Sequence, residues 1–526
     1  MVIWLACMEC AGIADAGGVK DVAYALCKGF DRAGEKVTLF IPAYACTSYE
    51  KIDDYKLLTD CYVDIDMCCK NERVTFASGK ISETGVNVIF INHPSFAQKH
   101  GVYVYTEEEE ENNPALKKGT GHVDMLFLDT LFSKAVAEYI RFVNKDETPD
   151  IVHCHDASAA VIPCYIKKLQ QKRFYKKTKC IVTIHNAGPA YHHDFSGIDE
   201  ARWYTGFNNE FLAQCMNGYR VEPYLLGSTN ARLTTVSTFY ADELLNPDNN
   251  DMTDGLAGAF FERNLSIEGI TNGIDYNCYC PEDTKISMLP YPMNPRSGEF
   301  EGKYKNREFL LKICKSKTHK IDKYTKNIKI YGHIDVPEKQ PVYFTYHGRI
   351  VWQKGLPILL DSIETILKVI PGARFIIGGQ GDTETEKHLE RITEGFPGKV
   401  VFLKGYNCCM ARLVAAAGDF MILPSLFEPC GLEDFIAQIY GTLPIAHATG
   451  GLKKIIDGET GYLYKDNSID SLMNAILTAV AAFYRGEDYH RGIIMWAADF
   501  IHNVYSWDFV IESKYLKFFK KCLSGT

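Results

Sequence analysis

The sequence lacks several features that would place it in common classes of protein. It has no run of about 18 apolar residues, which argues against a membrane-spanning helix. Lys and Arg total 57 against 66 Asp and Glu, so the net charge is −9 and no general basic field exists to hold nucleic acid or an anionic membrane. The first apolar segment is not followed by the fingerprint Gly-x-Gly-x-x-Gly, which disfavours a nicotinamide oxidoreductase.

Cysteine spacing gives little support for a disulfide scaffold or a metal site. The 18 cysteines are only about 3% of the chain, which is below the range of disulfide scaffolds. Cys7 and Cys10 have C-x-x-C spacing, but no second pair follows at zinc-finger spacing, so buried free thiols are the better interpretation. The first ten residues contain no Lys or Arg and include the acidic Glu9, which indicates a buried strand instead of a signal peptide. These features predict reduced thiols and a cytoplasmic location.

What the chain has is an alternation of short apolar segments with longer amphipathic stretches. Its 526 residues, 46% of them hydrophobic and 23% charged, suffice for two large globular domains. Many apolar segments are continuous, as in strands covered on both faces, and Leu356–Val369 and Ser468–Tyr484 predict helices. This alternation predicts an α/β fold with parallel sheets and right-handed crossovers. The predicted strands are Val37–Ile41, Val88–Ile91, Ile151–His153, Cys180–Ile184, Val342–Tyr346, Arg374–Gly378, Val400–Leu403, Phe420–Leu423 and Leu443–Ala446.

Turn formers and charge runs mark the surface segments. The segment Asn246–Asp254 is dense in turn-forming residues, which predicts a domain boundary near it. The acidic run Glu107–Glu111 predicts a solvated loop. Residues 314–340 hold many lysines and little apolar periodicity, so they predict a surface insertion or a loose connection.

In the N-terminal half, polar residues and glycines follow three predicted strands. Gly17 and Gly18 lie in a turn where backbone N–H groups can approach an anion, although a tight turn without a ligand explains them equally well. Asp156 follows a second strand, and His185 with Asn186 follows a third. Because ligands gather at the carboxyl ends of parallel strands, Asp156 is expected to face the cleft, and His185 and Asn186 are suited to bind sugar hydroxyls. A loop histidine capped by an aspartate is the alternative, and no further ligands stand at metal spacing.

In the C-terminal half, charged residues follow two further strands. Arg349 and Lys354 lie in a turn after an apolar strand, where a planar guanidinium and a compact ammonium can hold two phosphates. Solvated surface cations are the alternative. Glu428 follows Phe420–Leu423, and an acid there can accept a bond from a sugar hydroxyl or simply cap the next helix.

Together and in this order, the motifs resemble those of the bacterial glycogen synthase and plant starch synthase family of retaining glycosyltransferases. The resemblance runs from Glu9 to Trp507 and is tightest over Tyr346–Gly355, Leu423–Leu432 and Tyr440–Leu452. It implies two Rossmann-like domains facing across a cleft, the GT-B fold, with the last helix crossing back to the first domain. The implied division is an acceptor-side domain of residues 1–250 with 506–526, and a nucleotide-sugar-binding domain of residues 251–505.

The resemblance also implies an activity and a set of site residues. Members of this family transfer glucose from ADP-glucose to the 4-OH of an α-1,4-glucan, without a metal or other cofactor. Arg349 and Lys354 would hold the diphosphate, and Glu428 would contact the donor glucose. His185 would bind near its 6-OH, and Asp156 would lie beside the reacting centre. The implied substrate-binding residues are Gly17, Gly18, Asn186, Asn272, Cys430, Gly431, Leu432, Thr449, Gly450 and Gly451.

Three departures from the family pattern make the expected site more acidic or less polar. Asp15 stands where the family has lysine, and Ala157-Ser158 stands where it has tryptophan and histidine. Glu433-Asp434 replaces a polar pair that ends in glutamine. A like-charge contact at ~4 Å near a protein surface costs on the order of 4 kcal/mol before screening. A catalytically impaired relative that binds glucan or nucleotide sugar is therefore the alternative to an active glucan synthase.

Overall fold

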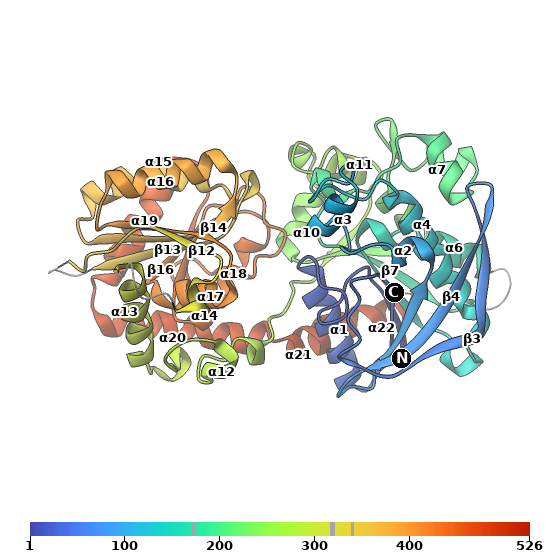
Figure 1. The fold of residues 1–526 in the computed structure, drawn as a ribbon, viewed down its shortest axis with the longest axis horizontal. Coiled ribbons are helices and arrows are strands. Elements are labelled where there is room, and N and C mark those ends of the chain that lie inside the picture. The colour runs from blue at the N-terminus through green and yellow to red at the C-terminus, as the bar shows by residue number, and fades with distance from the viewer. Residues whose placement is uncertain (171–174, 316–320, 338–340, 526) are drawn as a thin grey trace. The chain divides into compact units, whose positions relative to one another are not determined.

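Two sheets, each covered by helices, divide the chain into two α/β units (Figure 1). The computed structural model describes residues 1–170, 175–315, 321–337 and 341–525. The first unit comprises Met1–Asn272 and Val510–Thr526, and the second comprises Gly273–Phe509. Two α/β units confirm the predicted fold class.

The first unit is built on a nine-stranded sheet in the order β11-β10-β7-β6-β1-β2-β5-β4-β3. The strands from β11 to β5 are parallel, and β4 and β3 extend the sheet as an antiparallel hairpin. The strand order reverses at β1, so polar residues after β1, β6 and β7 share the edge where ligands bind in such sheets. The strands are β1 (Val2–Ala6), β2 (Lys36–Pro42), β3 (Ile52–Met67), β4 (Lys70–Ile81), β5 (Asn87–Asn92), β6 (Ile151–His155), β7 (Lys179–Ile184), β10 (Ala231–Thr235) and β11 (Ile267–Gly269).

The second unit is built on a seven-stranded sheet in the order β12-β15-β14-β13-β16-β17-β18, in which only β12 is antiparallel to its neighbour. Helices α15, α16 and α19 cover one face of this sheet, and α13, α17 and α18 cover the other (Figure 1). The elements are α13 (Glu301–Lys315), β12 (Ile328–Gly332), β13 (Val342–Ile350), α15 (Leu356–Val369), β14 (Ala373–Gly381), α16 (Thr383–Gly395), β15 (Val400–Gly405), α17 (Cys408–Ala417), β16 (Phe420–Leu423), α18 (Glu433–Ile439), β17 (Leu443–His447), β18 (Tyr462–Tyr464) and α19 (Ile469–Phe483).

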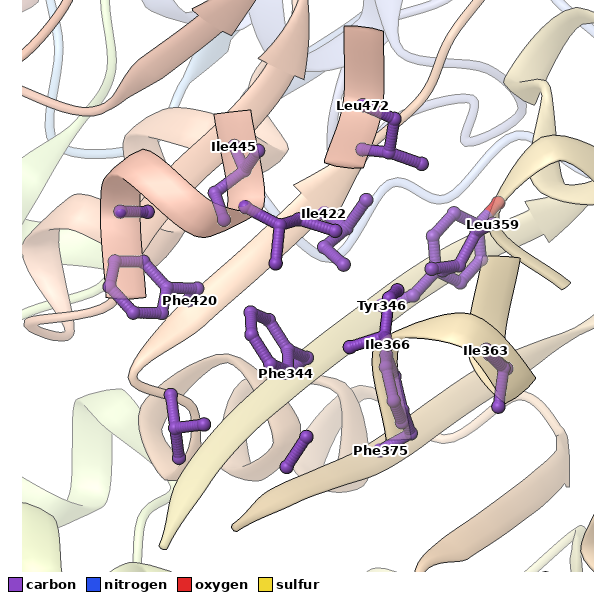
Figure 2. Packing of buried hydrophobic residues seen from close by; sticks show 14 of the residues in the cluster. Phe344, Tyr346, Leu359, Ile363, Ile366, Phe375, Phe420, Ile422, Ile445 and Leu472 are labelled. Atoms are coloured by element: carbon purple, nitrogen blue, oxygen red, sulfur yellow. The ribbon is translucent and has the colours of Figure 1, made fainter. Parts of the chain in front are cut away.

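The central strands of the second unit are buried on both faces, which explains their continuous apolar sequence. Figure 2 shows Phe344 of β13 among aromatic and aliphatic side chains of the neighbouring strands and of α15. Its ring centroid lies 5.3 Å from that of Phe375 and 5.9 Å from that of Phe420. Burial of one such side chain stabilises the fold by about 1.5–3 kcal/mol, so this cluster fixes the positions of the carboxyl ends of β13 and β16.

The boundary between the units differs from the predicted division at residue 250. Strand β11 pairs in parallel with β10, with Leu233 opposite Ile267, so the chain up to Asn272 belongs to the first sheet. The turn formers of Asn246–Asp254 instead form a loop inside the first unit, which includes a short 3₁₀-helix at Pro247–Asn249. The C-terminal return to the first unit begins at Val510 instead of residue 506.

The returning segment packs on helix α1 (Val19–Arg32) of the first unit. The ring of Phe30 lies 5.9 Å from that of Tyr515 and 5.4 Å from that of Phe519 in α22 (Leu516–Ser524). A Cβ built on Gly29 would lie 1.9 Å from the side chain of Ile511, so α1 accepts the segment only because it has no side chain there. This apolar contact fixes the end of the chain on the first unit.

Two surface predictions were wrong. Residues Glu107–Asn112 form helix α3, because Thr106 and Glu109 make a reciprocal capping box that satisfies its first N–H groups. Within 314–340, the described residues include an edge strand, β12, that pairs with β15. Residues 316–320 and 338–340 of that prediction lie outside the described chain.

The interpretation of the N-terminal cysteines is confirmed. Cys7 and Cys10 are buried free thiols, and burial raises the pKa of both, which is the reverse of what a thiolate ligand needs.

Within the described ranges, no helix is long and apolar enough to cross a membrane.

Candidate functional site

A cavity of about 190 Å³ lies at the carboxyl ends of β13 and β16 in the second unit. Strands β13 and β16 are neighbours in the sheet, so the loops that follow them meet at one edge. The residues that line the cavity are Tyr346, His347, Gly348, Arg349, Lys354, Leu423, Ser425, Glu428, Gly431, Leu432, Glu433, Asp434 and Leu452. The structure thus brings together five of the residues predicted for the site: Arg349, Lys354, Glu428, Gly431 and Leu432.

Lys354 and Glu428 form an ion pair inside this cavity. Lys354 Nζ lies 2.5 Å from Glu428 Oε2, and the same oxygen accepts a hydrogen bond of 3.0 Å from the Ser425 hydroxyl. Both side chains are half-buried. Arg349 is the penultimate residue of β13. Its side chain is exposed, and among the described residues it has no acidic partner. The cavity therefore presents two cations, of which one already has a carboxylate partner.

The loop that carries Lys354 is attached to the loop that carries Glu428 by hydrogen bonds at Gln353. Its carbonyl accepts from Leu426 N at 2.9 Å, and its Nε2 donates to Phe427 O at 2.9 Å. Gly355, with φ +62°, then turns the chain into α15. These contacts set the distance between the cation and the carboxylate before any ligand arrives.

We expect Gly355→Ala to destabilise the second unit by about 2 kcal/mol or more, because the residue combines positive φ with a close contact. A Cβ at Gly355 would lie 1.9 Å from the carbonyl oxygen of Pro424. Chemical denaturation of the purified protein measures the effect. Gly395→Ala in α16 is the control, since a Cβ there meets nothing within 4 Å. Equal stability of the two variants would contradict the strain argued for Gly355.

A buried ion pair supports the Glu428 loop from behind. Lys454 Nζ donates to Cys430 O at 2.6 Å, to Gly431 O at 2.9 Å and to Asp434 Oδ1 at 2.9 Å. Lys454 is 2% exposed and Asp434 is fully buried. The three protons of the ammonium are thus all used, and the loop is fixed to the first turn of α18.

The remaining predicted residues of the second unit support the loop instead of lining the cavity. Gly451 N donates to Glu428 O at 2.7 Å, and a Cβ on Gly451 would lie 2.0 Å from Cys430 O. Thr449 Oγ1 donates to Leu426 O at 3.3 Å, and Gly450 begins the 3₁₀-turn Gly450–Lys454. The glycines allow this turn to approach the Glu428 loop closely.

Two carboxyl groups of the cavity, those of Glu433 and Asp434, were not predicted as site residues. Burial raises the pKa of Glu433 to about 7, against the opposing effect of Lys354 and with a further increase from Glu428. Burial likewise raises the pKa of Asp434 to about 6, although Lys454 lowers it. The signal available in the sequence was the departure of Glu433-Asp434 from the family pattern.

In the first unit, the predicted catalytic residues Asp156 and His185 contact each other. Asp156 Oδ1 accepts from His185 N at 2.8 Å and from Tyr224 Oη at 3.3 Å. Asp156 has φ +59°, a left-handed backbone conformation that costs a non-glycine residue about 1–3 kcal/mol. His185 Nε2 lies 2.8 Å from His155 Nδ1, and burial lowers the pKa of both imidazoles.

The other predicted residues of the first unit lie at or near the same sheet edge. Gly17 N donates to the Glu9 carboxylate at 2.5 Å, and Gly18 precedes α1 with no side-chain cap. Asn186 Oδ1 accepts from Gly188 N at 2.8 Å. Asn272 ends the first of the two segments that make up this unit, and its buried Oδ1 has no partner among the described atoms.

Sequence analysis missed Glu9, whose carboxylate follows β1 and has one buried oxygen without a described partner. Burial raises its pKa to about 7, against the effect of the Gly17 N–H and with a contribution from Asp156. Its place directly after the first strand was the available signal.

One group in the described residues has the spacing of metal ligands, namely His192, Asp194 and Glu222. His192 Nδ1 lies 2.8 Å from Glu222 Oε2, and Nε2 lies 3.0 Å from Ala187 O. Because both ring nitrogens face acceptors, His192 carries both protons as an imidazolium. Asp194 is paired with Arg220 at 2.9 Å. His192 therefore offers no free lone pair to a metal, and the carboxylates of Glu222 and Asp194 already have cationic partners.

Each of the two units matches a known family of glycosyltransferase domains. Residues 2–260 match the family described as starch synthase catalytic domain, and residues 341–482 match glycosyl transferases group 1. The chain is 30% identical to a glycogen synthase of Thermodesulfovibrio yellowstonii over 498 residues, which cover 90% of each protein. It is 26% identical to a glycogen synthase of Exiguobacterium sibiricum, with 92% of each covered.

Among solved structures, the catalytic domain of starch synthase IV from Arabidopsis thaliana, bound to ADP and acarbose, superposes with a TM-score of 0.77. It is 24% identical and 99% of each chain is covered, so this likeness establishes the fold. Two Rossmann-like units of this kind form the GT-B architecture. With the shared fold and the 30% identity to a full-length relative, the chain belongs to the glycogen synthase and starch synthase family of glycosyltransferases.

Proposed function

We propose that this protein transfers glucose from ADP-glucose to the 4-OH at the end of an α-1,4-glucan, with retention of configuration. The observation that carries the proposal is the cavity in which Arg349, Lys354 and Glu428 meet at the carboxyl ends of two parallel strands. The curated relatives are named glycogen synthases, and the starch synthase neighbour holds ADP and acarbose. These names support an adenine nucleotide as leaving group and a glucan as acceptor.

The two cations supply the main chemical requirement of this reaction. Negative charge develops on the departing diphosphate, and fixed cations aimed at that charge lower the barrier. The Arg349 guanidinium can bind two phosphate oxygens in parallel, and Lys354 provides a compact charge at the side of Glu428. Glu428 holds Lys354 in place and faces the sugar hydroxyls with its other oxygen.

The contacts of the two predicted catalytic carboxylates, one in each unit, favour substitution on one face of the sugar over a double displacement. A covalent intermediate needs a free carboxylate beside the anomeric carbon. Glu428 is engaged by Lys354 and Ser425, and Asp156 is engaged by His185 N and Tyr224. We therefore assign the proton of the acceptor hydroxyl to the departing phosphate oxygen. The bond from C1 to that oxygen breaks as the bond from C1 to the acceptor oxygen forms.

His185 is suited to donate a hydrogen bond to the donor sugar. His155 Nε2 is buried and has no hydrogen-bond partner in the described part of the chain, so its single proton belongs on Nδ1, which faces His185 Nε2 at 2.8 Å. His185 then accepts at Nε2 and carries its own proton on Nδ1. Because burial keeps both rings neutral, this tautomer persists at physiological pH.

A donor panel tests the function. We expect the full chain to release ADP from ADP-glucose when glycogen is present, and to release little when glycogen is omitted. UDP-glucose and GDP-glucose in parallel reactions define the base preference. Nucleotide release is followed by a coupled assay, and glycogen binding by co-sedimentation. Co-sedimentation without release from any donor would support the catalytically impaired alternative and overturn the proposal.

A further inference from the structure

We propose that Glu433 binds the donor diphosphate as a neutral carboxylic acid, so that one proton enters the cavity with each donor. The neutral O–H donates a hydrogen bond to a phosphate oxygen beside Lys354. This inference rests on the proposed function, since it takes the cavity to be the diphosphate site. It adds a binding residue and a pH dependence that the known motifs do not contain.

The geometry places the Glu433 carboxyl where the diphosphate has to lie. Glu433 lines the same cavity of about 190 Å³ as Arg349 and Lys354. Of the three carboxylates that line it, Glu428 has Lys354 and Asp434 has Lys454 as ion-pair partner. No hydrogen bond or ion pair to Glu433 is found among the described residues, so this carboxyl is free to bind a ligand.

The charges in the cavity disfavour binding of the donor diphosphate as long as Glu433 is ionised. Asp434 and Lys454 neutralise each other, and Arg349 and Lys354 balance Glu428 and an ionised Glu433. A diphosphate diester adds two negative charges to a site that is then already neutral. Protonation of Glu433 removes one negative charge and replaces a repulsive contact with a donated hydrogen bond.

Among the groups that face each other in this cavity, Glu433 is the one whose protonation changes when the donor binds near pH 7. On β13, burial lowers the pKa of His347 to about 4 and raises that of Tyr346, so both are neutral near pH 7. The basic groups of the cavity are Lys354 and Arg349, and Asp434 on the same helix is paired with Lys454. Burial raises the pKa of Glu433 itself to about 7, despite Lys354 and with the help of Glu428. The protein without donor therefore loses this proton as pH rises through 7.

Calorimetric titration with ADP at pH 8, in buffers of different ionisation enthalpy, counts the protons. We expect the native protein to take up about one proton more per ADP than Glu433→Gln, which mimics the neutral acid. The comparison removes the proton that the terminal phosphate of ADP itself exchanges. Glu364→Gln, an exposed change on α15 outside the cavity, is the matched control and should behave as the native protein.

The affinity for the donor gives a second measurement that needs no variant. ADP-glucose has no group that titrates near pH 7, so its KM in the native protein should rise about tenfold per pH unit above 7 and level off below it. Glu433→Gln should have a nearly constant KM over the same range.

The outcomes separate the two levels of the proposal. ADP binding with equal proton uptake in the native protein and in Glu433→Gln, or a KM for ADP-glucose that stays flat above pH 7, would overturn the role of Glu433 and leave the donor site in place. Absence of ADP binding at every pH in both proteins would overturn the donor site itself, and the role of Glu433 with it.

Discussion

Replacing Lys354 with methionine should lower kcat for glucose transfer by about 10²–10³-fold, which corresponds to about 3–4 kcal/mol of lost transition-state stabilisation. The ammonium lies in the cavity at 2.5 Å from Glu428, on the 3₁₀-turn Trp352–Lys354 that follows the strand carrying Arg349. Its removal deletes a charge that acts on the departing diphosphate and leaves Glu428 without its cation. Steady-state kinetics with ADP-glucose and glycogen provide the measurement.

Two further variants separate charge from geometry at this position. Lys354→Arg keeps the charge but replaces a point charge by a planar fork, so we expect a partial recovery. Lys368→Met on α15, where the lysine is 72% exposed, should leave kcat unchanged. A kcat of Lys354→Met within about fivefold of the native value would remove Lys354 from the proposed machinery.

Replacing Lys454 with methionine should destabilise the second unit by about 3–5 kcal/mol, the usual cost of breaking one side of a buried ion pair. Lys454 is 2% exposed and donates to two carbonyls of the Glu428 loop as well as to Asp434. Its loss removes the ammonium donor from a buried carboxyl and from two carbonyl oxygens. Denaturant unfolding monitored on the intact chain gives the change in free energy.

The double variant Lys454→Met with Asp434→Leu tests whether the cost comes from the orphaned charge. With both charged groups replaced by apolar ones of similar size, we expect most of the lost stability to return, because no unpaired charge remains. Lys368→Met is again the surface control. If the double variant is no more stable than Lys454→Met alone, the loss comes from packing or from the loop carbonyls instead.

The positions of the buried strands followed from local sequence. The apolar runs Phe420–Leu423 and Leu443–Ala446 form β16 and the main part of β17, because a strand covered on both faces admits almost no polar residue. Leu356–Val369 forms α15 with the predicted ends, since the pattern of one buried face and one exposed face repeats along it. Residues such as Glu428 were predicted as site residues because they follow such strands, where ligands gather, and because their motifs resemble those of the family.

Pairing between distant segments could not be predicted in this way. The boundary of the first unit depends on the register of β10 with β11, and the strand β12 within the lysine-rich segment depends on β15. A short strand at a sheet edge has a weak sequence pattern, because part of its surface faces water and its stability comes from the neighbour it pairs with. Helix α3 likewise depends on a reciprocal cap instead of a buried face.

By itself the sequence determined the α/β class and the order of strands and helices along the chain. It also determined that Arg349, Lys354 and Glu428 lie at or just after the carboxyl ends of buried strands. The tertiary structure decided which charges meet. In it Lys354 pairs with Glu428 and Lys454 pairs with Asp434, whereas Glu433 forms no ion pair with any described residue. Burial and apolar periodicity are encoded within a few neighbouring residues, whereas the ionisation of a carboxyl group depends on charges that folding brings from distant parts of the chain.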